Sequence, residues 1–96
     1  MLLLKVSDLA VEKIKEELQG ISPDVKEPFI RLYMSVGWGG PSLQLALDES
    51  TNSDDTVTEI NGVKFVVHSS QSYYFDNVQL DYKEGMFGGG YRLVDL

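Results

Sequence analysis

Gly37-Trp38-Gly39-Gly40-Pro41 connects two runs, 29–36 and 42–48, in which apolar and polar residues alternate. An alternation with a period of two is typical of strands that bury one face. The glycines of the connection indicate a backbone that adopts positive φ or passes close to another group. This stretch therefore predicts a pair of antiparallel strands joined by a glycine-rich connection, whose length leaves the register of the pair open.

Two interpretations of this connection stay open. In the structural one, it is a wide connection in which Trp38 covers apolar surface and is itself at least partly covered, by the domain or by a second copy. In the functional one, Gly37, Trp38, Gly39, Gly40 and Pro41 form a loop that contacts a ligand or a partner. A phosphate-binding loop is excluded, because the stretch lacks the glycine–lysine patterns and leads into a strand. We favour the structural interpretation.

The flanking segments predict one helix and further short strands. Residues 9–18 carry apolar side chains at helical spacing, Ser7 suits the N-cap, and Gly20 suits the C′ position. Strands are expected at residues 2–6, 56–60, 63–67, 78–83 and 91–94, and a serine-capped helical turn at residues 69–75. The residues alone thus indicate a small α+β domain with mostly antiparallel strands.

Turn signals separate these elements. Asn61-Gly62 between two β-rich runs predicts a two-residue type I′ hairpin, because both central positions need positive φ. The proline-containing segment 21–28 predicts a loop, and Asp76-Asn77 predicts a turn. Residues 85–90 hold four glycines and predict a second glycine-rich loop.

Composition restricts the function. The 96 residues fit one domain, and 15 acidic against 8 basic side chains give a net charge of −7. Such a chain is repelled by nucleic acid and by anionic membranes, whereas a basic protein partner suits it. It contains no cysteine, so a disulfide and a thiolate ligand are both excluded. No run reaches membrane-spanning length, and we expect a soluble cytoplasmic protein.

The carboxylates and the single histidine do not form a recognisable catalytic pattern. The acidic segment 48–55 invites a calcium interpretation, but its glycine and glutamate positions do not fit an EF-hand, so a solvated, mobile loop is favoured. His68 is expected to be a hydrogen-bonded residue at a strand end, since one imidazole is a weak metal signal. We therefore expect neither an enzyme nor a bound metal or cofactor.

The order of the elements and three motifs resemble a known family. The motifs are Asp54-Asp55-Thr56-Val57, then Phe75-Asp76 followed by Leu80-Asp81-Tyr82, and Gly88-Gly89-Gly90-Tyr91-Arg92-Leu93. Together they resemble the HesB-like family of A-type iron–sulfur cluster carriers and assembly proteins, over essentially the whole chain. The resemblance implies a single HesB-like domain at residues 1–96. Its fold would be a β-rich α+β fold, a curled sandwich-like or barrel-like sheet with one N-terminal helix.

The resemblance also implies three cysteine ligands, and none is present here. Counting back from Leu45-Ala46-Leu47, the first falls on Trp38, and the other two would follow the strand at 91–93, where the sequence ends at Leu96. Thiolates are the usual ligands of iron–sulfur clusters, so we expect no bound cluster. Two functions remain. One is a non-catalytic role in iron–sulfur biogenesis through assembly partners, with a homodimer left open. The other is a divergent protein-interaction or small-ligand-binding module that retains only the scaffold.

Overall fold

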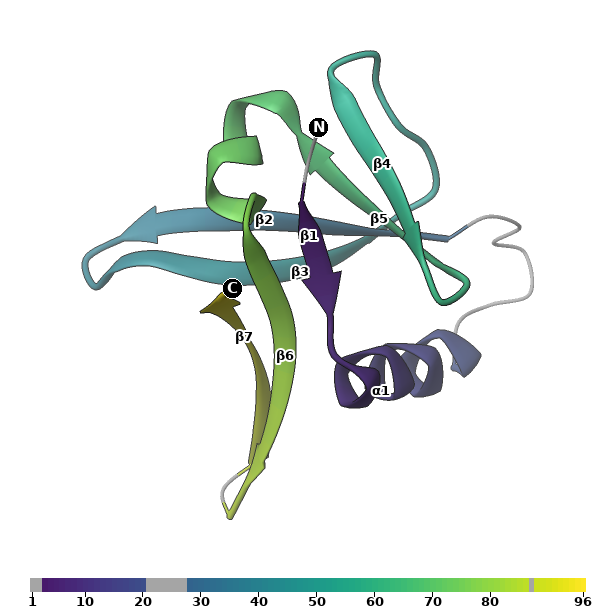
Figure 1. The fold of residues 1–96 in the computed structure, drawn as a ribbon, viewed down its shortest axis with the longest axis vertical. Helices are drawn as coiled ribbons and strands as arrows, with labels where there is room; N and C mark the ends of the chain where they lie inside the picture. The colour runs from purple at the N-terminus through teal and green to yellow at the C-terminus, as the bar shows by residue number, and fades with distance from the viewer. Residues whose placement is uncertain (1–2, 21–27, 87) are drawn as a thin grey trace.

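The computed structural model describes residues 3–20, 28–86 and 88–96. The strands form two open sheets, one with the order β3-β2-β5-β4 and one with the order β1-β6-β7 (Figure 1). The elements in chain order are β1 (Leu4–Val6), α1 (Asp8–Gln19), β2 (Phe29–Gly37), β3 (Gly40–Asp48), β4 (Asp55–Ile60), β5 (Val63–His68), the 3₁₀ helix η1 (Ser69–Phe75), β6 (Val78–Gly85) and β7 (Gly88–Asp95). The predicted β-rich fold with one N-terminal helix is confirmed.

Both sheets are mixed. The β2–β3, β4–β5 and β6–β7 pairs are antiparallel hairpins, whereas β1 pairs with β6 and β2 pairs with β5 in parallel. The hairpins follow from local turns, but the parallel pairs join segments far apart in the sequence and carry no local signal. No helix in the described residues is long and apolar enough to cross a membrane.

The start of α1 follows the prediction. Ser7 is the N-cap, and its hydroxyl accepts a hydrogen bond from the main-chain N–H of Ala10 at 3.2 Å. The face that carries Val11 and Ile14 is buried against the sheets. Gly20 follows the helix, as predicted, but it is the C-cap residue and not C′, and its φ of −84° is an ordinary right-handed value.

The Asn61-Gly62 turn is confirmed. Ile60 and Val63 are paired across a two-residue connection, and φ is 50° at Asn61 and 84° at Gly62. Positive φ at both central positions is the signature of type I′, whose twist matches that of the flanking strands.

The β2–β3 connection is much tighter than predicted. Gly37 pairs with Gly40, so only Trp38 and Gly39 form the turn, and Pro41 lies inside β3 opposite Val36. The predicted wide connection is therefore wrong. The positive φ of 89° at Gly40 allows strand pairing to resume directly after the two-residue turn. Glycine adopts this φ without strain, which explains its presence at this position.

The second glycine-rich segment is also mostly strand. Gly85 ends β6 and pairs with Gly88, and β7 begins there, three residues before the predicted start. A Cβ added at Gly89 would lie 2.0 Å from the hydroxyl of Tyr82, so this glycine makes room for the neighbouring tyrosine. Phe87 and most of the predicted loop 21–28 lie outside the described residues.

One hydrophobic core joins both sheets and the helix. Ile14 of α1, Leu32 of β2, Phe65 of β5 and Leu80 of β6 are at most 1% exposed. These side chains come from elements that are separated in sequence, so burial of the shared face holds the two sheets and α1 together.

Candidate functional site

The β2–β3 hairpin extends beyond the rest of the molecule and carries the predicted partner loop at its end (Figure 1). One face pairs Leu32 with Leu45, Met34 with Leu43, and Val36 with Pro41. Exposure rises along this face from 0% at Leu32 to 72% at Val36. An apolar stripe thus starts in the core and ends exposed at the tip.

Trp38 is fully exposed to solvent at that tip. Its relative exposure is 109%, so the prediction that the domain covers it is wrong. A two-residue turn gives the ring no strand face to fold back on, which is the physical reason. Cover by a second copy stays a prediction. The five loop residues lie together at the hairpin tip, and their role as a ligand or partner loop stays a prediction.

A side chain from η1 supports the hairpin. The amide of Gln71 accepts from the Met34 N–H at 2.6 Å and donates to the Met34 carbonyl at 3.0 Å. It therefore continues the edge of β2 beyond its short pairing with β5, which ends at Arg31. Nothing in the sequence around Gln71 indicates this role, because the two partners are 37 residues apart.

His68 lies at the end of β5 and is hydrogen-bonded there, as predicted, and it caps η1. Its Nδ1 accepts from the Ser70 N–H at 3.1 Å and lies 2.8 Å from the Ser70 hydroxyl. The helical turn is confirmed, but its N-cap is His68 and not a serine. No group of three or more metal-binding side chains occurs among the described residues.

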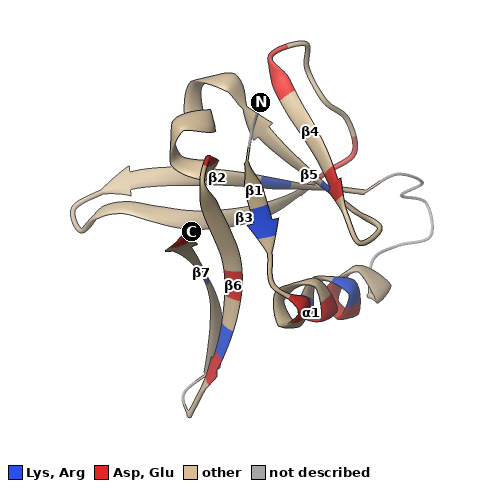
Figure 2. Cartoon of the chain, in the orientation of Figure 1, with Lys and Arg blue, Asp and Glu red and all other residues tan. Residues whose placement is uncertain are grey.

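The ends of the acidic segment 48–55 are held by Arg31. Its guanidinium forms two hydrogen bonds with Asp55, at 2.8 and 3.0 Å, and a further one with Asp48. The Asp55 side chain is 0% exposed, so the expectation of a solvated loop is wrong for this end. Hydrogen bonds from Arg31 and from the Asn52 N–H lower the pKa of Asp55 to about 2. The other acidic residues are spread over several elements (Figure 2).

The Leu80-Asp81-Tyr82 motif serves the structure. The Asp81 carboxylate accepts from the Ser7 hydroxyl at 2.8 Å and from the Tyr82 N–H at 2.9 Å, and these bonds lower its pKa. The motif thus fixes the start of α1 against β6. Leu80 is fully buried and Tyr82 stacks edge-on with Tyr91, so none of these groups is offered to a substrate.

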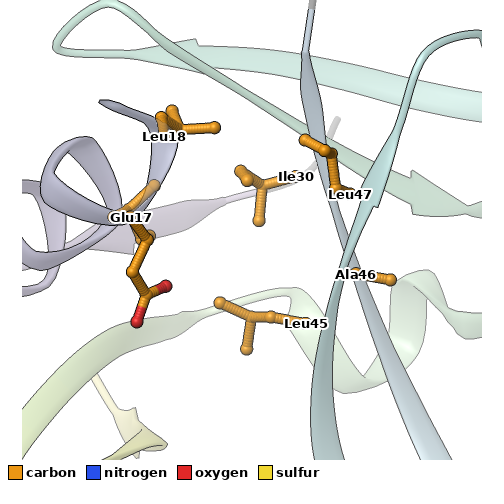
Figure 3. A pocket seen from close by; sticks show the side chains of 7 residues that line it. Glu17, Leu18, Ile30, Leu45, Ala46 and Leu47 are labelled. Atoms are coloured by element: carbon orange, nitrogen blue, oxygen red, sulfur yellow. The ribbon is translucent and has the colours of Figure 1, made fainter. Parts of the chain in front are cut away.

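A pocket of about 130 Å³ lies between α1 and the β2–β3 hairpin (Figure 3). Its lining is aliphatic except for Glu17, whose carboxylate accepts from the Tyr91 hydroxyl at 3.2 Å. Burial and the nearby Glu17 raise the pKa of Tyr91. Sequence reasoning missed this pocket, because its lining comes from α1 and the β2–β3 hairpin, whose packing no local pattern encodes. Leu18, a partly buried apolar residue near the end of the helix, was the available signal.

Most of the chain matches one family model. Residues 2–92 fit the family described as "Iron-sulphur cluster biosynthesis". The chain belongs to this family. The resemblance drawn from the motifs is therefore confirmed.

Two relatives align with most of the sequence. The chain is 35% identical, over 85 residues, to "Iron-sulfur cluster insertion protein ErpA" of Marinobacter nauticus, covering 85% of this chain and 74% of that protein. It is 30% identical, over 92 residues, to a protein of Aquifex aeolicus, covering 95% of this chain and 78% of that one. The two alignments thus cover most of this chain.

Solved structures share the fold. A solution structure of a protein from Aquifex aeolicus superposes with a TM-score of 0.78 at 29% identity, covering 100% of this chain and 94% of that one. The crystal structure of IscA with a [2Fe-2S] cluster superposes with a TM-score of 0.75, covering 97% of this chain and 82% of that one. Its 19% identity establishes the common fold alone.

This family member does not offer the donors that a cluster needs. The hairpin turn at Trp38 presents an indole and glycines, which supply no thiolate or imidazole ligand. The sole imidazole, that of His68, has its Nδ1 engaged by Ser70. The residues present therefore do not fit an iron–sulfur cluster.

Proposed function

We propose that this chain is a non-catalytic cytoplasmic protein that takes part in iron–sulfur cluster biogenesis through protein partners and binds no cluster itself. The observation that carries the proposal is Trp38. It occupies the place where the family resemblance implies a cysteine ligand, and the 96 residues contain no cysteine. Family membership links the chain to cluster biosynthesis, and the missing thiolates leave a partner-binding role.

The exposed hairpin tip supports a partner contact. Trp38 at 109% and Val36 at 72% exposure form, with Pro41, an apolar tip on a two-stranded arm. Tryptophan is among the residues that dominate binding energy at protein interfaces, because a large rigid ring buries much area at little entropic cost. An exposed indole next to a proline and a valine thus suits a partner pocket.

Affinity capture tests this proposal. Tagged chain and its Trp38→Ala variant are incubated with cell extract from the source organism, and bound proteins are quantified by mass spectrometry. Enrichment of a cysteine desulfurase or a cluster scaffold protein, reduced at least tenfold by Trp38→Ala, is the expected result. Val57→Ala is the matched control, because Val57 is an exposed apolar residue on β4, away from the hairpin. The proposal is contradicted if the native chain and Trp38→Ala capture the assembly proteins equally well. It is also contradicted if only proteins unrelated to cluster assembly are captured.

The second candidate is a small-ligand or interaction module that keeps only the family scaffold. The pocket between α1 and the hairpin favours it, because an aliphatic cavity with one carboxylate has the make-up of a ligand site. Native mass spectrometry of the purified chain distinguishes the two candidates. A retained small molecule supports the module, and the bare mass of the chain supports the first proposal.

A further inference from the structure

The outer edge of β3 has no strand partner within the described residues. β3 is the last strand of its sheet and pairs only with β2. The main-chain groups of Met34 are bonded to Gln71, so they point away from β3. In an antiparallel pair, opposite residues behave alike, so its partner Leu43 directs its own N–H and C=O to the free side. With a period of two, Leu45 and Leu47 do the same.

This edge lacks the usual protection against strand addition. Natural edge strands are short, charged or interrupted, which prevents pairing with other chains. β3 has nine residues, and its proline and its only charge, Pro41 and Asp48, lie near its two ends. The stretch between them presents a continuous row of donors and acceptors.

The aliphatic pocket opens beside the same edge. Leu45 and Leu47 of β3 face Ile30 and Leu18 across it, and Ala46 points away from it (Figure 3). Its volume of about 130 Å³ is close to the roughly 150 Å³ cavity that holds a benzene-sized group. Leu47 is 41% exposed, so the pocket wall reaches the surface next to the free main-chain groups. A strand laid along β3 can therefore place one side chain in the pocket.

Charge selects that side chain. Glu17 is the one charged residue among the described residues that line the pocket, and the Tyr91 hydroxyl orients its carboxylate. A lysine combines an aliphatic stem with a cationic head, so its stem matches the leucines and its ammonium group matches Glu17. The net charge of −7 attracts a basic partner as a whole.

We infer that the outer edge of β3 and the adjoining pocket form a docking site for an extended, lysine-bearing segment of a basic partner protein. The segment adds as a strand to Leu43, Leu45 and Leu47, and its lysine enters the pocket beside Glu17. Strand addition supplies affinity through main-chain hydrogen bonds, and the pocket supplies specificity. The inferred docking site lies on β3 and α1 and does not include Trp38. A failure of this inference can therefore be distinguished from a failure of the proposed function.

A nine-residue peptide of alternating threonine and valine around one central lysine is the probe. It is titrated into ¹⁵N-labelled chain and followed by NMR. The amide signals of Leu43, Leu45 and Leu47 are expected to shift and to exchange more slowly with solvent on binding. Two control peptides are expected to bind at least tenfold more weakly than the lysine peptide. One has glutamate at the centre, and the other has alternate backbone nitrogens methylated.

Two variants test the role of the carboxylate. Glu17→Gln keeps an acceptor for the Tyr91 hydroxyl but removes the charge. It is expected to lower the affinity for the lysine peptide about three- to tenfold. Glu16→Gln is the matched control, because Glu16 is exposed on the same helix and does not line the pocket. It is expected to change the affinity by less than about twofold.

Three results overturn the inference. The first is peptide binding that shifts residues away from β3, or no binding at millimolar peptide. The second is equal affinity for the lysine and glutamate peptides. The third is a dimer in sedimentation experiments whose Leu43, Leu45 and Leu47 amides are already protected without peptide, because a second copy then occupies the edge.

Discussion

Asp55→Asn is expected to destabilise the fold strongly, because it breaks the ion pair that closes the 48–55 connection. The Asp55 side chain is 0% exposed and receives two hydrogen bonds from Arg31. Its pKa is lowered from 3.8 to about 2, which corresponds to about 2 kcal/mol of stabilisation of the charged form at neutral pH. Asparagine presents one acceptor and one donor to the guanidinium, so we expect a loss of about 2–3 kcal/mol, or roughly 10–20 °C in Tm.

Urea unfolding of the two proteins between pH 7 and pH 3 measures this. A carboxylate with a depressed pKa in the folded state stabilises above its unfolded pKa, and its contribution disappears as the pH falls through the folded pKa. The stability gap between native chain and Asp55→Asn should therefore be constant from pH 7 to about pH 5 and fall to about half at pH 3. Asp54→Asn is the control, because this neighbouring carboxylate is exposed. A loss equal to that of Asp54→Asn, or a gap that does not change with pH, refutes the reasoning.

Three further outcomes follow from the backbone and the hairpin tip. Gly62→Val is expected to cost about 1–3 kcal/mol in thermal unfolding, because valine is strained at a φ of 84°, and an unchanged melt contradicts the type I′ turn. Gly89→Ala is expected to cost about 1–3 kcal/mol by displacing the Tyr82 ring, whereas Gly90→Ala, whose Cβ meets nothing within 4 Å, should be tolerated; equal losses count against the packing of Tyr82 over β7. Trp38 fluorescence of the monomeric chain is expected to show the emission of hydrated indole and free quenching by iodide, since the ring is fully exposed in one copy; a blue-shifted, protected emission at higher protein concentration indicates the predicted cover by a second copy.

Local signals predicted the elements that local chemistry determines. The Ser7 cap and the Asn61-Gly62 turn are where they were expected, because each depends on the φ preferences and hydrogen bonds of neighbouring residues. The glycine runs were misjudged for a related reason. Glycine marks a place where the backbone needs freedom or space, and at Gly89 the need is space for a tyrosine within a strand, not a loop.

The features that matter most for the site are long-range. Arg31 meets Asp48 and Asp55 at separations of 17 and 24 residues, and the Tyr91 hydroxyl meets Glu17 at a separation of 74. No periodicity or motif encodes such contacts, since the first two arise from strand order within the β3-β2-β5-β4 sheet and the third from the packing of α1 against β7. The sequence therefore indicated the family and the position of the β2–β3 connection, whereas the exposure of Trp38, the pocket and the ion pair of Arg31 needed the fold.

Anaerobic reconstitution with iron and sulfide tests the central claim most directly. The chain is expected to stay colourless after desalting, with no absorption in the visible sulfur-to-iron charge-transfer region, because it contains no cysteine and one histidine. Trp38→Cys is expected to stay colourless as well, since a single thiolate does not complete the ligand set of a cluster. A brown protein with stoichiometric iron and acid-labile sulfide would contradict the account and place a cluster-binding site on this chain.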